Sequence, residues 1–243
     1  RGLGNFSEML RDERFWGGMR ASMLFVILSV PLRLLGALLL GLLLYRGGRG
    51  TPTFRAAVYL PTVVPDVAWA LLWLYIFNPL FGPLNWLLRA FGVFGSGGDQ
   101  PAGWLLDPTS AQLAIVVMLF WTLGEGFVVM MAALQDIPRD LQEAAAIDGA
   151  GIWQRFWTMT LPLIAPMMLL VAFRDTIHSF QANFVATTIL TKGGPYYATT
   201  YLPYWIYGNA IEFGRFGYAA AMTLVLFAIT GAFIMLQFLV IRR

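Results

Sequence analysis

The residues best suited to chemistry in this 243-residue sequence are polar and ionisable side chains that interrupt long apolar stretches. Arg174, His178 and Gln181 are spaced i, i+4 and i+7, so they share one face of a helix, and Asp175 lies beside them. Inside a membrane each such charge costs about 2.5 to 3.5 kcal/mol, so it must face protein or water. Three interpretations are open: the stripe meets water at a helix end, lines a passage for a hydroxylated solute, or relays protons through His178.

Asp66, Trp69 and Trp73 also share a helical face, in an earlier apolar stretch. A sugar site favours this combination, because a carboxylate accepts hydroxyl hydrogen bonds while an aromatic ring covers the C–H face of the sugar. The alternative is structural. Asp66 follows Pro65 and would cap a broken helix, and the tryptophans would belong to the aromatic belt of a membrane protein.

Glu125 follows Gly124 near the middle of a third apolar stretch, where a carboxylate cannot face lipid cheaply. Pairing with a basic residue such as Arg33 and lining of a cavity are both compatible with this position. With the two groups above, Glu125 completes a candidate solute pathway. We predict no catalytic residue and no metal site, because the sequence has no cysteine and a single histidine.

The composition indicates a membrane protein. Charged residues make up 12% of the chain, about half of the roughly 25% typical of soluble domains, and hydrophobic types reach 58%. So few charges cannot cover a surface in water, which excludes an ordinary soluble enzyme. The basic residues are scattered between apolar runs, and this excludes a nucleic-acid-binding footprint.

The elements that must position these residues are membrane-spanning helices. A bilayer core about 30 Å thick requires about 20 apolar residues. Five stretches satisfy this requirement: Ala21–Tyr45, Ala56–Leu80, Ser110–Gln135, Met159–Gln181 and Phe216–Ile241. We therefore predict an all-α, polytopic helical membrane protein with one domain over residues 1–243. Pro31 in the first stretch, and Pro61 and Pro65 in the second, predict breaks, and the glycine-rich residues 94–108 predict a flexible loop tip.

The basic residues between and after the spans predict the orientation. Residues 45–55 hold three arginines without an acid, and Arg242 and Arg243 end the chain. The positive-inside rule places both clusters in the cytoplasm, together with the connection 136–157. Residues 1–20 then form an external or interfacial segment.

The connection Asp136–Pro162 is too well organised for a linker. Pro138 suits the first turn of a helix and Asp140 the positive end of its dipole. Gly149 stands where a helix end needs a residue with positive φ, and a second short amphipathic piece begins at Ile152 and offers aromatic side chains for burial. The sequence thus predicts helix, turn and helix, which either lie on the headgroups as an interfacial hairpin or dock a soluble partner.

The same connection carries the pattern Glu-Ala-Ala, three residues, Gly, nine residues, an apolar residue, one residue and Leu-Pro. This spacing resembles the EAA signature of permease subunits of binding-protein-dependent ABC importers, with Met159 where the family usually has isoleucine. Further stretches resemble the carbohydrate-uptake branch, the maltose and glycerol-phosphate type of permease: residues 54–65, 77–79, 147–154, 190–195 and 217–221.

The resemblance implies a type I ABC importer permease fold. Family members normally have six or more spans, so we expect a further helix ahead of the five. The EAA segment, residues 136–162, would be a coupling helix in a cleft of a separate ATPase, where Glu143 bonds with polar groups and Gly149 permits the turn. The residues assigned to coupling on this basis are Glu143, Ala144, Ala145, Asp148, Gly149, Leu161 and Pro162.

The resemblance also implies the partners. The chain has no Walker-type phosphate loop, so ATP would be bound by a separate ATPase subunit, and the permease itself would be neither an enzyme nor a holder of a cofactor. A second permease of different sequence, an extracytoplasmic solute-binding protein and membrane lipid complete the expected set, in the cytoplasmic (inner) membrane of a prokaryote. The alternative hypothesis is an ion-coupled secondary transporter that works without an ATPase, with Glu125, Asp175 and His178 as coupling groups.

Overall fold

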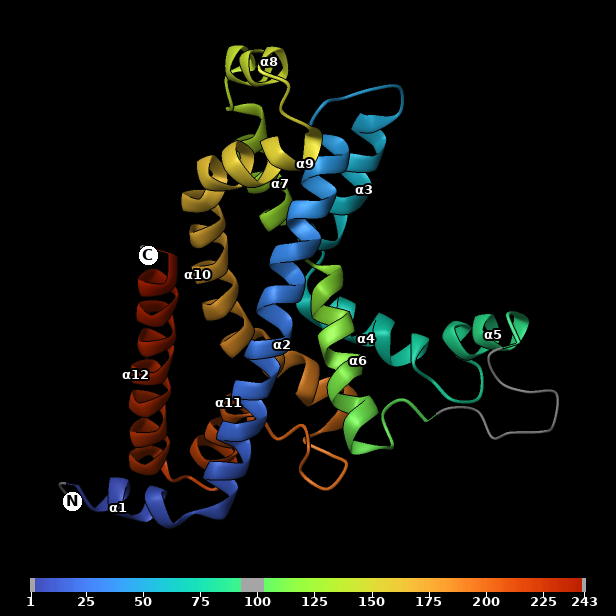
Figure 1. The fold of residues 1–243 in the computed structure, drawn as a ribbon. Helices are drawn as coiled ribbons and strands as arrows, with labels where there is room; N and C mark the ends of the chain where they lie inside the picture. Colours follow the sequence, from blue (N-terminus) through green and yellow to red (C-terminus); the bar gives the residue numbers. More distant parts are fainter. Residues whose placement is uncertain (1–2, 93–102, 242–243) are drawn as a thin grey trace. The chain divides into compact units, whose positions relative to one another are not determined.

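The computed structural model describes residues 3–92 and 103–241, and within those ranges it contains helices and no β-strand (Figure 1). This confirms the predicted all-α class. Two compact units are present: the first comprises residues 1–29, 64–119 and 178–231, and the second residues 30–63, 120–177 and 232–243. Part of the predicted loop tip at 94–108 lies outside the described residues, which resume at residue 103.

The helices follow one another in this chain order. The elements are α1 (Gly4–Arg11), α2 (Glu13–Leu44), α3 (Thr51–Val63), α4 (Asp66–Ile76), α5 (Pro83–Ala90), α6 (Pro108–Trp121), α7 (Gly124–Gln135), α8 (Arg139–Ile147), α9 (Ile152–Arg155), η1 (Phe156–Thr160), α10 (Leu161–Ala186), η2 (Thr187–Thr191), α11 (Leu202–Tyr207), η3 (Gly208–Glu212) and α12 (Phe216–Ile241). The three η elements are π-helical turns that continue the α-helix before them. Because α2, α10 and α12 are long, each contributes residues to both units.

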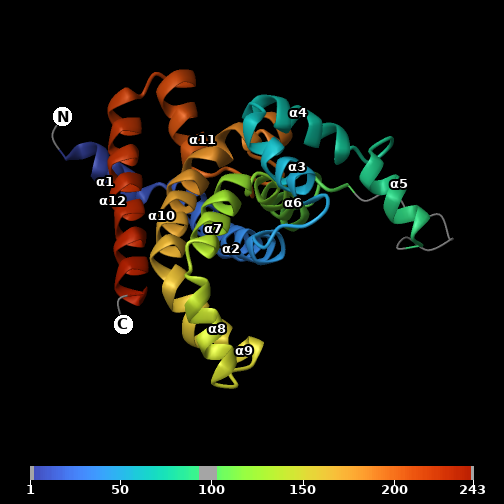
Figure 2. The same cartoon turned by 90° about the horizontal axis from the view of Figure 1, so that it is seen from above.

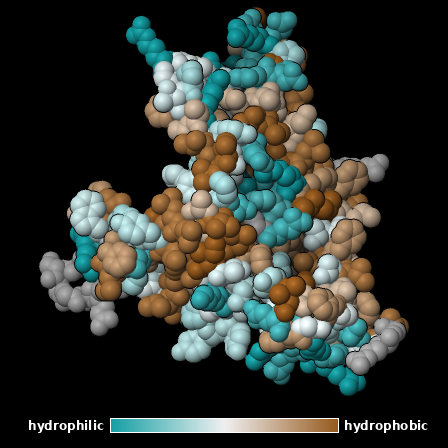
Figure 3. Space-filling view, turned by 180° about the vertical axis from the view of Figure 1, so that it is seen from behind, coloured by the Kyte–Doolittle hydropathy of each residue, from teal (hydrophilic) through white to brown (hydrophobic). Residues whose placement is uncertain are grey.

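Three helices are long and apolar enough to cross a membrane: α2, the continuous run from Ile152 to Thr191, and residues 216–239 of α12. Two bent pairs pass the same test together, α3 with α4 at 103° and α6 with α7 at 47°. Counting each bent pair as one span gives up to five among the described residues, the number predicted. Exposed apolar side chains form brown areas on the face drawn in Figure 3, as expected for surfaces in contact with lipid.

The predicted breaks are only partly correct. α2 begins at Glu13, so residues 13–20 belong to the same helix as the first span. It also continues through Pro31, because a single missing N–H is tolerated where neighbouring groups re-satisfy the backbone. In the second span Pro61 lies inside α3, and the sharp bend comes at residues 64–65, directly before α4.

The first unit has two cores, one around Ile115 of α6 and one around Leu202 of α11. The N terminus of α11 is held to α2, because the backbone N–H of Leu202 donates to the hydroxyl of Ser22 at 2.8 Å. One turn earlier a Cβ on Gly18 would lie 2.8 Å from the carbonyl oxygen of Thr200, so α2 and the segment before α11 approach too closely for a side chain there. These contacts fix α2 against α11 within this unit.

The second unit is organised around α7, where Phe127 and Met130 are fully buried. Small residues let the neighbouring helices approach, as is usual between membrane helices. A Cβ on Gly124 would lie 2.7 Å from the carbonyl oxygen of Val58 in α3. A Cβ on Gly41 of α2 would lie 3.3 Å from the side chain of Met130. The candidate pathway residues Glu125, Arg174 and Asp175 therefore lie in a unit whose helices are closely packed.

We predict that Gly124→Ala destabilises the protein by about 1 to 3 kcal/mol, because the added methyl meets backbone that must shift. Gly231→Ala is the matched control, since a Cβ there meets nothing within 4 Å and alanine favours the helix. Thermal unfolding of the purified protein in detergent measures both changes. Equal unfolding temperatures for the two variants would contradict the close α3–α7 approach.

Candidate functional site

The helix predicted after Pro138 is α8, and Asp140 lies in its first turn as expected. Every residue of α8 is at least partly exposed, so the described part of the chain buries none of them. Figures 1 and 2 both show α8 and α9 at one end of the second unit. This confirms the predicted helix, turn and helix.

The turn between α8 and α9 has the geometry that glycine provides. Gly149 has φ +80°, its N–H donates to the carbonyl of Ala146 at 3.1 Å, and the N–H of Ala150 donates to the carbonyl of Ala145 at 2.9 Å. With Asp148 as the C-cap, these two bonds form a Schellman motif. A Cβ on Gly149 would meet nothing within 4 Å, so a substitution there is opposed by backbone strain and not by crowding.

The tip of this hairpin is apolar and exposed. Ile147 is 86% exposed, Ile152 is 78% exposed and Trp153 is 75% exposed. Trp153 and Trp157, which the sequence offers for burial against lipid or a partner, are both exposed in the chain by itself. Exposed apolar patches of this kind mark surfaces that another molecule covers.

A cavity of about 710 Å³ lies at the base of α8 within the second unit. Arg55 closes the C-terminal end of α2 there, since its guanidinium donates to the carbonyl oxygen of Leu44 at 2.6 Å. Arg139 and Glu143 both line the cavity, and among the described residues they do not form the ion pair that their i, i+4 spacing suggests. The lining residues are Tyr45, Arg46, Gly47, Arg55, Leu134, Gln135, Ile137, Arg139, Gln142 and Glu143.

Arg33 and Asp175 form a buried ion pair in the second unit. The distance from Arg33 Nη2 to Asp175 Oδ1 is 3.3 Å, and the two side chains are 1% and 2% exposed. Arg33 Nη1 also donates to the hydroxyl of Thr122 at 3.0 Å. Because both ions are paired and hydrogen-bonded, their burial is tolerated.

Glu125 forms an ion pair with Arg174, whereas the sequence suggested Arg33 as one possible partner. This second pair is more open, with side chains 47% and 34% exposed for Glu125 and Arg174. Arg174 also donates to Asp175 at 2.9 Å, which links the two pairs into one network across α2, α7 and α10. Three of the candidate pathway residues therefore lie together.

The other candidate pathway residues belong to the first unit. His178 is half-buried and Gln181 is exposed. Asp66 is exposed in the first turn of α4, which suits the helix dipole, and Trp69 and Trp73 pack partly buried against the core around Ile115.

Sequence reasoning missed Asn183. It is fully buried in α10, and among the described residues neither polar atom of its side chain has a hydrogen-bond partner. Its spacing was a usable signal, since Asn183 lies four residues after Ser179 and eight after Asp175 on the same helical face. Ser179 is itself buried and bonds with Ser29 of α2 at 3.1 Å.

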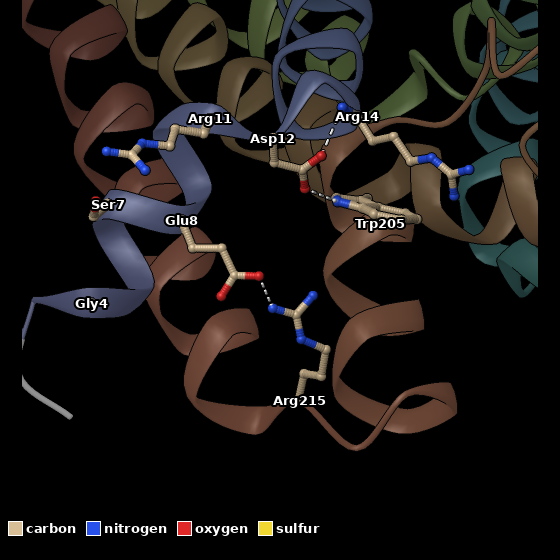
Figure 4. Close-up of a pocket in the computed structure, with 8 residues that line it drawn as sticks. All are labelled: Gly4, Ser7, Glu8, Arg11, Asp12, Arg14, Trp205 and Arg215. Carbon is tan, nitrogen blue, oxygen red and sulfur yellow. Dashed lines mark hydrogen bonds and ion pairs between the residues drawn. The ribbon is translucent and has the colours of Figure 1, made fainter.

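A further pocket, of about 640 Å³, lies in the first unit beside α1 (Figure 4). Glu8 of α1 points toward Arg215 and forms an ion pair with it. Arg14 stacks over the ring of Tyr197, 4.8 Å from its centroid. The lining residues are Gly4, Ser7, Glu8, Arg11, Asp12, Arg14, Trp205 and Arg215.

Asp12 is the hydrogen-bond acceptor that connects the residues around this pocket. Its carboxylate accepts hydrogen bonds from the hydroxyl of Tyr218 at 2.6 Å, the backbone N–H of Arg14 at 2.9 Å and the indole N–H of Trp205 at 3.3 Å. Burial acts to raise the pKa of Asp12, but these hydrogen bonds outweigh it and hold the pKa below its ordinary 3.8. A depressed folded-state pKa means that the carboxylate stabilises the fold above about pH 4 and that this stabilisation is lost as the pH falls.

Residues 33–243 match the family model described as binding-protein-dependent transport system inner membrane component. The chain belongs to this family. The permease is 33% identical over 243 residues to the sn-glycerol-3-phosphate transport system permease protein UgpA of Agrobacterium fabrum (strain C58 / ATCC 33970), covering 100% of this chain and 80% of UgpA. It is also 33% identical over 250 residues to the lactose transport system permease protein LacF of Rhizobium radiobacter, covering 100% of this chain and 81% of LacF.

The fold has a close counterpart among solved structures. The crystal structure of a bacterial ABC transporter involved in the import of the acidic polysaccharide alginate contains a chain that superposes on the permease with a TM-score of 0.83. The identity is 21%, and the match covers 100% of this chain and 84% of that chain. At this identity the likeness concerns the fold, and it confirms the predicted ABC importer permease fold.

The buried ion pair generates a prediction. Asp175→Leu leaves the guanidinium of Arg33 buried without its counter-ion and should cost about 3 to 5 kcal/mol. Arg33→Met should cost less, because Arg174 still pairs with Asp175, and the double variant should recover much of the loss. Thermal unfolding in detergent ranks the three variants. A double variant that is no more stable than Asp175→Leu would refute the pairing.

Proposed function

We propose that this permease is the membrane subunit of an ATP-driven importer for a hydroxylated solute, a sugar, an oligosaccharide or a glycerol-phosphate-like molecule. An extracytoplasmic binding protein delivers the solute, two ATPase subunits supply the energy, and a second permease of different sequence completes the path. Membership of a binding-protein-dependent transport family supports the class of importer. The names of UgpA and LacF, a glycerol-phosphate and a lactose permease, support the class of solute.

One observation carries the proposed coupling to an ATPase: the exposed apolar tip of the α8–α9 hairpin. A hairpin lying on the membrane by its apolar side would present that side to lipid over both helices. The most exposed apolar residues of the hairpin, Ile147, Ile152 and Trp153, lie where α8 turns into α9. A projecting apolar tip fits a cleft in a soluble partner. We propose that this partner lies on the cytoplasmic side, together with the C terminus.

Some of the coupling residues would touch the ATPase, and others would orient the helices that do. Glu143 and the small Ala144 face a partner directly, since both are exposed on α8. Gly149 adopts the positive φ of the turn and so determines the direction of α9. Leu161 and Pro162 begin α10, and α10 would transmit a displacement of the hairpin into the membrane-spanning part of the chain. Closure of the ATPases would then move the permeases as rigid bodies docked through this hairpin. ATP stays on the ATPases, and the permease contributes no catalytic residue.

The open ion pair supports a solute path in the second unit. A charged pair that is partly exposed within a spanning helix cannot face hydrocarbon, so Glu125 and Arg174 face water or the second permease. Their carboxylate and guanidinium can exchange hydrogen bonds with the hydroxyl groups of a solute. Asp175 holds Arg174 from the buried side and is a positioning residue.

An ion-coupled secondary transporter is the weaker hypothesis. Its coupling carboxylates would have to be available to a proton or a cation, whereas Asp175 and Glu125 are each paired with an arginine. No observation on this chain favours it over the ATP-driven importer.

Cross-linking tests the proposal directly, because the chain has no cysteine and single-cysteine variants need no background removal. We expect a benzophenone attached to Ile147→Cys to capture an ATPase subunit in the assembled complex. Leu224→Cys, at a position that is also exposed (60%) but lies in α12, is the control and should not capture it. Uptake into proteoliposomes should require both ATP on the hairpin side and the binding protein on the other side.

Two results would overturn the proposed function. One is capture of only lipid from Ile147→Cys in the assembled complex. The other is solute uptake by the permease without an ATPase, driven by an ion gradient.

The turn yields a second prediction. Gly149→Val should abolish most solute-dependent ATP hydrolysis by misdirecting α9, because a β-branched residue is strongly disfavoured at φ +80°. Gly149→Asn should retain most of it, since asparagine tolerates this conformation. Solute-stimulated ATPase activity of the reconstituted complex measures both variants, and equal loss in both would contradict a conformational role for the turn.

A further inference from the structure

The cavity at the base of α8 has a positively charged lining. Arg46, Arg55 and Arg139 contribute three positive charges and Glu143 one negative charge, an excess of two. Asp136 and Asp140 are close in sequence but are not among the lining residues. The three arginines come from the loop after α2, from α3 and from the first turn of α8, so the fold gathers charges that are separate in sequence.

Two of these arginines are held in place. Arg55 donates through Nε and Nη2 to the carbonyl oxygens of Leu44 and Tyr45, at distances from 2.6 to 3.3 Å. Arg46 donates through Nε to the hydroxyl of Tyr45 at 2.7 Å and lies over its ring. A guanidinium has five N–H donors, so these bonds within the described chain leave donors on both arginines for a ligand. Their geometry is set before any ligand binds.

The cavity is lined by residues near the ends of predicted spans. Its lining includes residues next to the end of α2, the start of α3 and the end of α7, three elements that belong to predicted spans. Tyr45 is a residue type typical of the interface between lipid and water. Close in sequence to the lining residues Tyr45 and Arg55, Leu43 is 76% exposed and Phe54 is 64% exposed. We call these two exposed apolar residues the apolar flank.

We propose that this cavity binds the phosphate of an anionic phospholipid, with the acyl chains over Leu43 and Phe54. The charge excess of the lining suits a phosphodiester, and the apolar flank suits its tails, which a free phosphate or an acidic side chain of another protein would not use. The proposal rests on the proposed function only for the side of the membrane, the cytoplasmic leaflet. A phosphate held by Arg46, Arg55 and Arg139 ties the base of α8 to α2 and α3, so anionic lipid strengthens the connection through which the hairpin acts.

Native mass spectrometry of the purified complex tests this site, with phosphatidylglycerol and phosphatidylcholine added in parallel. The variant is Arg139→Gln, and Arg49→Gln is the matched control, because Arg49 lies in the same loop region but does not line the cavity. We expect about tenfold weaker retention of phosphatidylglycerol in Arg139→Gln and unchanged retention in Arg49→Gln. Arg46→Gln should behave like Arg139→Gln, and retention of phosphatidylcholine should be low throughout.

Each of several other results would overturn the lipid site. Equal retention of phosphatidylglycerol in Arg139→Gln and Arg49→Gln would show that the lipid does not bind in the cavity. Binding of inorganic phosphate that displaces phosphatidylglycerol at low millimolar concentration would identify free phosphate as the ligand. Loss of the ATPase from Arg139→Gln with unchanged lipid retention would identify an acidic protein side chain. Lipid retention is measured without transport, so the lipid site can stand even where capture of the ATPase fails.

Discussion

The left-handed turn at Gly149 is the constraint on which the hairpin depends. Its two hydrogen bonds end α8, and its positive φ sends the chain into α9, so Ile147 and Ile152 come to the same tip. The turn is not crowded, and its requirement is purely conformational. From Ile152 the backbone stays helical through η1 and α10 to Thr191, so a displacement of the tip acts on one continuous helical element.

The charges within the spans divide into two kinds by their exposure. Arg33 and Asp175 are buried and hold α2 and α10 together, where loss of one partner is costly. Glu125 and Arg174 are partly open, and their shared neighbour Asp175 connects them to the buried pair. One network thus serves both the packing of the second unit and the polar surface that we assign to the solute path. Glycines in α7 and α2 let these helices pack closely against their neighbours, and this close packing positions the charged network.

Much of this architecture could be predicted from the sequence, and the failures have definite causes. Local signals predicted α8 and its turn, because Pro138 and Gly149 act through their own backbone preferences. The pairing of Glu125 with Arg174 could not be predicted, since it depends on how α7 packs against α10. Pro31 failed as a break signal, because a helix with packed neighbours tolerates one missing donor. The molecule that covers Trp153 could not be predicted either, because Trp153 is exposed in the chain by itself and its cover would belong to another molecule.

Hydrogen–deuterium exchange over residues 139–155 tests the central claim most directly, when the permease alone is compared with its complex with the proposed ATPase. The hairpin is exposed in the chain by itself, so its amides should exchange readily at the tip and become protected when the ATPase binds. We expect protection centred on residues 144–153, with little change in α12. Unchanged exchange across the hairpin in an assembled and active complex would contradict it.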